Sequence, residues 1–341
     1  MSNAVFIIPT GIGASIGGFA GDASPAVKLI SKVCPVITNP KTVNAAVFSG
    51  IGENILYVEG YSINEFFKEK IALRTSKFNK IGIIFDKAIP EHIFNIHINT
   101  INAMKSVYGI DIKHIIVTHE AAGVRFGITE GGFSTGCLEN PDTIISAAVS
   151  LKNKGVDAIA VVCYFEGSDD ADYAGGKGAD PVGGVEAVIS HLISKELNMP
   201  AAHAPAFNEI SFSTKIVDKR AASEYITPTF LPCIILGLYN APRVIDIKEK
   251  NPADITLRSI NSLILPYNCL GNTAVLKALE KNIPVIAVEE NKTVLNITPE
   301  ALGIEEKVIV VKNYIEAAGY LLALREGIPI DTLTSTIKTG S

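Results

Sequence analysis

Residues 158–165 read AIAVVCYF, an unbroken apolar run that is the strongest indication of the fold. The run is too short to cross a membrane, because a spanning helix needs about 20 apolar residues. It is typical of a strand that is buried on both faces of a sheet, and PVIAV at 284–288 has the same character. Shorter runs at Ser262–Pro266 and Leu231–Leu238 also fit buried strands. Together these runs predict a parallel sheet covered by helices on both sides.

Amphipathic segments of helical character alternate with the expected strands. Many begin at a Pro and end at a Gly, as Glu91–Tyr108 does before Gly109. The other helices are expected at Ser24–Val33, Asn140–Gly155, Asp180–Leu197, Asn272–Glu280 and Tyr314–Glu326. The other strands are expected at Ala4–Pro9, Lys80–Asp86, His114–Thr118, Asp157–Phe165 and Lys307–Lys312. This alternation predicts an α/β protein with a mostly parallel, doubly wound, Rossmann-like sheet.

The chain has 341 residues and a mass of 36.3 kDa, which is room for one large domain or two packed lobes. Residues 207–230 are a long stretch without an expected helix or strand, at which a lobe boundary is expected. We therefore expect an N-terminal α/β lobe at 1–206, a connecting segment at 207–230 and a C-terminal α/β lobe at 231–341.

Composition excludes some classes of function. Thirty basic against 35 acidic side chains give a net charge of −5, whereas a nucleic-acid-binding protein normally has a basic surplus. No run is long enough to span a membrane, and the N-terminus lacks the basic start of a secretory signal. The five cysteines are unevenly spaced and form no CxxC, which favours a reducing, cytoplasmic compartment. With 48% hydrophobic residues, we predict a homo-oligomer that buries apolar surface between subunits.

A Gly-rich segment, TGIGASIGGFAGD at 10–22, follows the first expected strand. Ligands of parallel α/β sheets bind beyond the carboxyl ends of the strands. Glycines let a ligand approach the backbone amides, and a helix behind them would favour a phosphate or carboxylate. The segment is not a P-loop and is a poor dinucleotide fingerprint, and a tightly packed turn is the alternative. The substrate-binding residues expected here are Thr10, Gly11, Gly13, Gly17, Gly18 and Asp22.

A second segment, at 166–191, is rich in acidic residues and Gly, which is typical of a loop that closes over a ligand. Its carboxylates are candidate ligands for a divalent metal, Mg²⁺ or Mn²⁺, with Glu166, Asp169 and Asp180 as the metal-binding residues. A solvated acidic loop is the alternative. Glu186 and His191 are five residues apart and do not share a helix face, so they are not expected to bind one metal together.

Three residues are candidates for catalysis. His203 lies among small apolar residues and suits acid–base chemistry, although a buried structural histidine is the alternative. Glu120 follows a strand, and if the strand continues its side chain is expected to diverge from that of His119. Cys269 lies before a helix N-terminus, which is expected to lower the pKa of the thiol, although a core cysteine is the safer assumption.

Polar residues after later strands complete the expected rim. Gly271 and Asn272 offer backbone amides to an anion. Glu290 and Asn291 follow PVIAV, and one of the adjacent acids at 289–290 is expected to face the rim. These four residues are further candidates for substrate binding.

Long motifs in this chain resemble an uncharacterised family, the domain-of-unknown-function proteins known mainly from photosynthetic bacteria and plants. The motifs that carry the resemblance are PTGIGASIGGFAGDA, LYVEGY, GADPVGGVEAVISH, AHAPA, LPCIILGL and AVEEN. They extend over nearly the whole chain. The resemblance implies family membership and no mechanism.

The sequence favours an enzyme that acts on a small polar metabolite, bearing a carboxylate or phosphate, by acid–base chemistry. An isomerase, a lyase or a hydrolase fits such groups. One alternative is a nucleotide- or cofactor-dependent enzyme, although the weak fingerprint counts against it. The other is a small-molecule binding or regulatory protein without turnover.

Overall fold

The computed structural model describes residues 3–44, 52–110, 112–167, 171–208 and 215–333. Within these residues a six-stranded parallel sheet has the order β14-β13-β12-β1-β2-β3. Its strands are β1 (Asn3–Phe6), β2 (Val36–Thr38), β3 (Ile55–Tyr57), β12 (Ile260–Pro266), β13 (Val285–Val288) and β14 (Val308–Val311). Numbered along the chain within the sheet, this order is 3-2-1-4-5-6, the arrangement of dinucleotide-binding sheets. The strand order reverses between β1 and β12.

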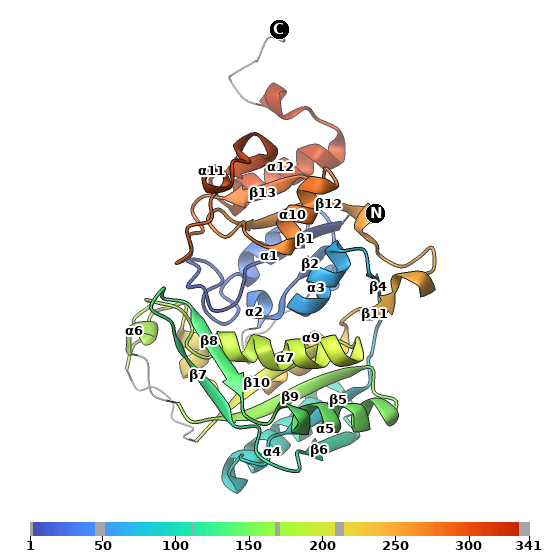
Figure 1. Ribbon diagram of the computed structural model, residues 1–341, viewed down its shortest axis with the longest axis vertical. Coiled ribbons are helices and arrows are strands. Elements are labelled where there is room, and N and C mark those ends of the chain that lie inside the picture. The colour runs from blue at the N-terminus through green and yellow to red at the C-terminus, as the bar shows by residue number, and fades with distance from the viewer. Residues whose placement is uncertain (1–2, 45–51, 111, 168–170, 209–214, 334–341) are drawn as a thin grey trace.

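A second parallel sheet has four strands in the order β10-β9-β5-β6 (Figure 1). Its strands are β5 (Ile81–Phe85), β6 (His114–Val117), β9 (Ala158–Phe165) and β10 (Ala201–Phe207). Two antiparallel pairs accompany the sheets, one made of β4 (Ile71–Arg74) and β11 (Arg243–Asp246), the other of β7 (Val124–Ile128) and β8 (Ser134–Leu138). The fold is therefore the predicted Rossmann-like α/β class.

Alternate residues of the strands pack into different cores, which explains their unbroken apolar character. In β1, Phe6 belongs to the core that includes α1 (Ser24–Ile30) and α12 (Tyr314–Glu326), whereas Val5 belongs to the core that includes α3 (Gly60–Phe67) and α10 (Thr273–Glu280). The second sheet is covered in the same way by α4 (Glu91–Tyr108) with α9 (Leu231–Tyr239), and by α5 (Pro141–Asn153) with α7 (Gly183–Leu197). Short helices are α2 (Pro40–Val43), α6 (Ala171–Ala174), α8 (Ala222–Tyr225) and α11 (Pro299–Leu302).

One expectation about the elements needs correction. Leu231–Leu238 was expected to be a strand but forms α9, and Pro232 occupies its first turn. The Ala201–Phe207 segment, for which no element was expected, is β10. Among the helices of the described residues, none is long and apolar enough to cross a membrane.

The two sheets divide the chain differently from the expected lobes of 1–206 and 231–341. The first sheet takes β1 to β3 from the start of the chain and β12 to β14 from its last third. The second sheet is formed by the intervening residues. In Figure 1 the blue and orange-red segments therefore lie together above the green segments, and α7 lies between the two sheets.

Candidate functional site

A cavity of about 350 Å³ lies between the two sheets. The first sheet contributes the residues that follow the carboxyl ends of β1, β2 and β3, including Thr10, Lys41 and Glu59. The opposite wall comes from α7, β10, α8 and α9. The cavity is therefore at the edge where ligands of parallel α/β sheets bind, and its size suits a small molecule. Its charged and titratable lining residues are Lys41, Glu59, Asp180, Glu186, His191, His203 and Glu224.

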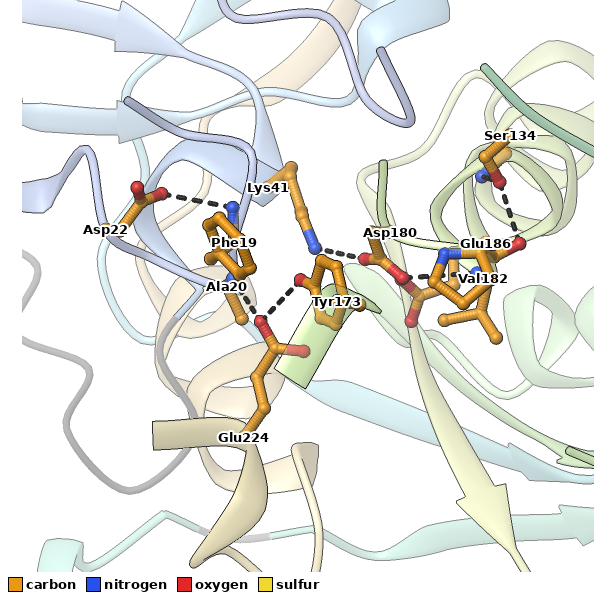
Figure 2. Close-up of polar contacts among 12 residues, drawn as sticks. Phe19, Ala20, Asp22, Lys41, Ser134, Tyr173, Asp180, Val182, Glu186 and Glu224 are labelled. Atoms are coloured by element: carbon orange, nitrogen blue, oxygen red, sulfur yellow. Dashed lines mark hydrogen bonds and ion pairs between the residues drawn. The ribbon is translucent and has the colours of Figure 1, made fainter. Parts of the chain in front are cut away.

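A buried ion pair connects the two walls. Lys41 lies in α2, directly after β2, and its ammonium group contacts the carboxylate of Asp180 (Figure 2). Their side chains are 9% and 4% exposed. Asp180 also accepts the N–H of Val182 at 3.1 Å, just before α7. Burial alone would lower the pKa of Lys41, but the carboxylates of Asp180, Glu224 and Glu186 outweigh it and raise that pKa above its ordinary value. Lys41 is therefore a permanent cation.

Glu186 and His203 form a second pair, in which the His203 side chain is buried and that of Glu186 is 20% exposed. The N–H of Cys163 on β9 donates to His203 Nε2 at 3.2 Å, so the ring proton is on Nδ1, 3.3 Å from Glu186 Oε1. The His203 ring stacks on Phe165. Burial lowers the pKa of His203 to about 3, so this imidazole is neutral at pH 7. Burial, and then the charge of Asp180, raises the pKa of Glu186 to about 8, so this carboxyl group is mostly protonated.

Glu224, in α8, is the third carboxyl group of the cavity. Its Oε1 accepts the N–H of Ala20 at 2.5 Å and the hydroxyl of Tyr173 at 2.8 Å (Figure 2). Burial raises the pKa of Glu224 to about 7, against the opposing effect of Lys41. Glu224 therefore changes its protonation state near neutrality.

Glu59 and His191 form an ion pair on another part of the wall. Glu59 caps α3 by accepting the N–H of Tyr61 at 2.7 Å, and His191 comes from α7. Burial lowers the pKa of His191, but contact with Glu59 outweighs it and the pKa is raised. Glu186 and His191 therefore line one cavity from the same helix, but each has its own partner.

The Gly-rich segment is held by hydrogen bonds within the protein. Gly11, Gly13, Gly17 and Gly21 adopt left-handed φ angles. Asn291 accepts the N–H of Ile16 at 3.0 Å and donates to its carbonyl at 2.8 Å. Asp22 accepts the N–H of Phe19, and the N–H of Ser15 donates to the carbonyl of Lys292. Of the six expected substrate-binding residues in this segment, only Thr10 lines the cavity, and anion binding by the segment stays a prediction.

The structure separates the three candidates for catalysis. Only His203 lines the cavity. The expected pKa of Cys269 was wrong in direction, because burial raises it to about 12 and its thiol donates to the carbonyl of Pro266. Glu120 is exposed, and it does not diverge from His119, because the strand ends at Val117 and the two side chains approach to 3.2 Å.

The remaining expected substrate contacts have structural roles or lie at the surface. Asn272 lines the cavity and caps α10 by accepting the N–H of Val275 at 3.1 Å. Gly271 lies against Ile297, and Glu290 is exposed. Neither of these two lines the cavity.

The expected metal ligands do not form a cluster in the described part of the chain. Glu166 is exposed, Asp169 lies outside the described residues, and Asp180 is paired with Lys41. No group of three or more His, Cys, Asp or Glu side chains among the described residues could hold a metal ion. The ammonium group of Lys41 occupies the position beside Asp180 where a cation would bind.

Lys41 and Glu224 were not expected as site residues. A lysine beside Asn39-Pro40 and a glutamate in a four-residue helix look like surface residues in the sequence. The position of Glu224 in the site can be found only from the packing of the two sheets. A usable signal was present for Lys41, which follows a strand at its carboxyl end.

Comparisons with known proteins show the family of this chain without assigning an activity. A family model described as "Protein of unknown function (DUF3326)" matches residues 3–334. An uncharacterized lipoprotein of Synechococcus sp. is 35% identical over 329 residues, which cover 95% of this chain and 91% of that protein. No solved structure matches. The name of the Synechococcus relative contradicts the expectation of a cytoplasmic location, which is therefore corrected.

Proposed function

We propose that this chain, which belongs to the DUF3326 family, is an enzyme that moves protons on a small polar metabolite in the cavity between its two sheets. The reaction class is an isomerisation, an elimination or a hydrolysis. The metabolite bears a carboxylate or a phosphate group. The observation that carries the proposal is the enclosed Glu186–His203 pair, with its imidazole proton fixed on Nδ1.

Glu186 is the proposed general acid. Its pKa of about 8 keeps a proton available at neutral pH, which is the condition for efficient proton donation. After donation, the Nδ1–H of His203 remains 3.3 Å from the new carboxylate and stabilises it. His203 is thus a positioning residue, which acts through Glu186. Glu224, with a pKa of about 7, is the proposed base.

Lys41 is the proposed contact for the acidic group of the metabolite. An ammonium group has three N–H donors, and Asp180 is its one hydrogen-bond partner among the described residues. Thr10 also lines the cavity, after the end of β1, and carries a hydroxyl group. Asp180 holds Lys41 in place, and the apolar side chains of Ile63, Phe230 and Ile234 limit access of water.

Solvent-isotope exchange tests this proposal. Wild-type protein is incubated in D₂O with pools of small carboxylates and phosphate esters, and mass spectrometry finds compounds that gain deuterium or change mass. We expect conversion by the wild type and a loss of at least ~100-fold in E186Q. The control is E196Q, which changes a half-exposed residue of the same helix. Conversion that survives in E186Q would overturn the role of Glu186. Binding without conversion would favour a binding protein.

A nucleotide-dependent enzyme is the second candidate, because the strand order 3-2-1-4-5-6 is that of dinucleotide-binding sheets. The amides of Ser15, Ile16 and Phe19 count against it, since protein groups already occupy them. Equilibrium dialysis with ATP and NAD separates the two candidates. Binding in the micromolar range would favour the nucleotide-dependent enzyme.

A further inference from the structure

Glu59 and His191 are a titratable pair of the cavity that the proposed chemistry does not use. Glu59 precedes α3 on one wall, and His191 lies in α7 on the other. The Glu59 side chain is 2% exposed, and both of its carboxyl oxygens are engaged. Its Oε2 accepts the N–H of Tyr61, and its Oε1 contacts His191 Nδ1. A buried carboxylate in contact with one ring nitrogen fixes the orientation of the imidazole and the position of its proton.

The other ring nitrogen of His191 is available to the cavity. Nδ1 is buried against Glu59, whereas the side chain as a whole is 42% exposed. Nε2 has no hydrogen-bond partner within the described residues and stays accessible. A Cβ atom at Gly60, which also lines the cavity, would lie 3.1 Å from Cε1 and 3.7 Å from Nε2. Glycine at this position therefore keeps the space beside the Nε2 edge of the ring open.

The proposed chemistry leaves two carboxyl groups in the wrong protonation state. After one turnover Glu186 has lost a proton and Glu224 has gained one, so both must exchange protons before the next. A group that touches both the cavity and the solvent serves this exchange if it titrates near neutrality. Burial lowers the pKa of His191, but contact with Glu59 outweighs it and raises that pKa above its ordinary 6.5. The ring can therefore both take up and release a proton near pH 7.

We propose that His191 is the proton relay of this cavity and that Glu59 is its positioning residue. The inference rests on the proposed function. In one direction Nε2 takes a proton from the solvent, and the imidazolium passes it through water to the carboxylate of Glu186. In the other direction the neutral Nε2 takes the proton of Glu224 and releases it to the solvent. Only O–H and N–H bonds form and break, and Glu59 holds the Nδ1–H throughout.

The dimensions of the site permit this transfer. His191 and Glu186 are five residues apart on α7, which is about 7.5 Å along the helix axis. A short chain of water molecules bridges such a separation, and a cavity of about 350 Å³ has room for it.

The other histidines do not fit this role. His203 is neutral, and its Nε2 already accepts the N–H of Cys163. The remaining four do not line the cavity, and they are His92, His97, His114 and His119.

Side-chain NMR tests the pair without a substrate. Long-range ¹H–¹⁵N spectra of the full chain report the tautomer and the pKa of each histidine. We expect the neutral ring of His191 to carry its proton on Nδ1. E59Q keeps the size of the side chain and removes its charge, so it should lower the pKa of His191 by at least ~1 and leave that of His92 unchanged. A neutral ring protonated on Nε2, or a pKa that E59Q does not change, would overturn the inference.

Rescue by imidazole tests the relay itself. In the D₂O assay His191→Ala should slow conversion by at least ~10-fold, and millimolar imidazole, a small base that can enter the cavity, should restore most of the lost rate. E59Q should shift the pH profile of kcat toward acid, in step with the pKa measured by NMR. The control is His92→Ala, which should neither slow conversion nor respond to imidazole.

The outcomes separate the relay from the proposed function. Conversion by the wild type that His191→Ala leaves intact, or a loss that imidazole does not restore, would overturn the relay and leave the proposed function standing. No conversion by the wild type would overturn the proposed function, and the relay with it.

Discussion

Glu186 should make the protein less stable as the pH rises. Its pKa is raised from an ordinary 4.5 to about 8, so the folded state favours the neutral carboxyl group. The stabilisation that follows from this preference is fully present below pH 4.5 and is lost as the pH rises through 8. One proton of difference changes the free energy of unfolding by at most ~1.4 kcal/mol per pH unit. Urea unfolding across this range should therefore give a flatter curve for E186Q than for wild type. If the free energy of unfolding depended on pH in the same way in wild type, E186Q and E196Q, the raised pKa of Glu186 would be contradicted.

His203 should have the opposite effect and make the protein less stable as the pH falls. Burial lowers its pKa from an ordinary 6.5 to about 3, so the folded state favours the neutral ring. This stability is present above pH 6.5 and is lost as the pH falls toward 3, by at most ~1.4 kcal/mol per pH unit. His203→Gln should remove that dependence in circular dichroism titrations. His92→Gln, on the exposed face of α4, is the control, and an equal change in both variants would refute the prediction.

At the scale of elements, one side chain holds the Gly-rich segment in place. Asn291 is fully buried and bonds to both backbone groups of Ile16 and to the hydroxyl of Tyr314 at 2.6 Å. Asn291→Ala leaves these groups without partners, and we expect a loss of ~2–4 kcal/mol in the free energy of unfolding. Hydrogen exchange at residues 15–22 should also accelerate. Asn95→Ala, on the exposed side of α4, is the control. If Asn291→Ala lost no more stability than this control, other contacts would have to hold the Gly-rich segment in place.

Helix limits could be predicted where local chemistry decides them. Both α4 and α12 end at glycines with left-handed φ angles, Gly109 and Gly327, as their sequences indicated. LPCIILGL could not be assigned from periodicity, because it is apolar on every side, as a buried strand or a buried helix would be. The AAHAPAF segment is a strand because it pairs with β9, although it has no β-branched residue.

The candidate site could also be predicted only in part, because local sequence patterns mark some of its residues and not others. Thr10, Asp180 and His203 were found because they lie in polar or otherwise unusual segments that local patterns mark. Lys41 and Glu224 come from short helices, 183 positions apart in the numbering, which meet only after both sheets have formed. No local pattern predicts that these two residues line the same cavity.

At the scale of the whole molecule, the homo-oligomer stays a prediction that a definite surface can test. Exposed apolar side chains on β14, α12 and the residues after α12 include Val310, Ile315, Leu322 and Ile328. Burial of such a patch stabilises association by about 25 cal/mol per Å². We expect sedimentation at micromolar concentration to show an assembly that Ile315→Lys weakens. A monomeric wild-type protein would refute the prediction.

The Lys41–Asp180 pair should stabilise the folded protein, because it joins the edge of the first sheet to the segment that leads into α7. Lys41→Met leaves the carboxylate of Asp180 buried without its cation, which costs ~3–5 kcal/mol. Asp180→Leu in the same chain removes that charge, so the double variant should be more stable than the sum of the two single losses. A double-mutant cycle by urea unfolding measures this coupling. Additive losses would mean that the two residues stabilise the walls of the cavity independently, and that the sheets are held together by apolar packing alone.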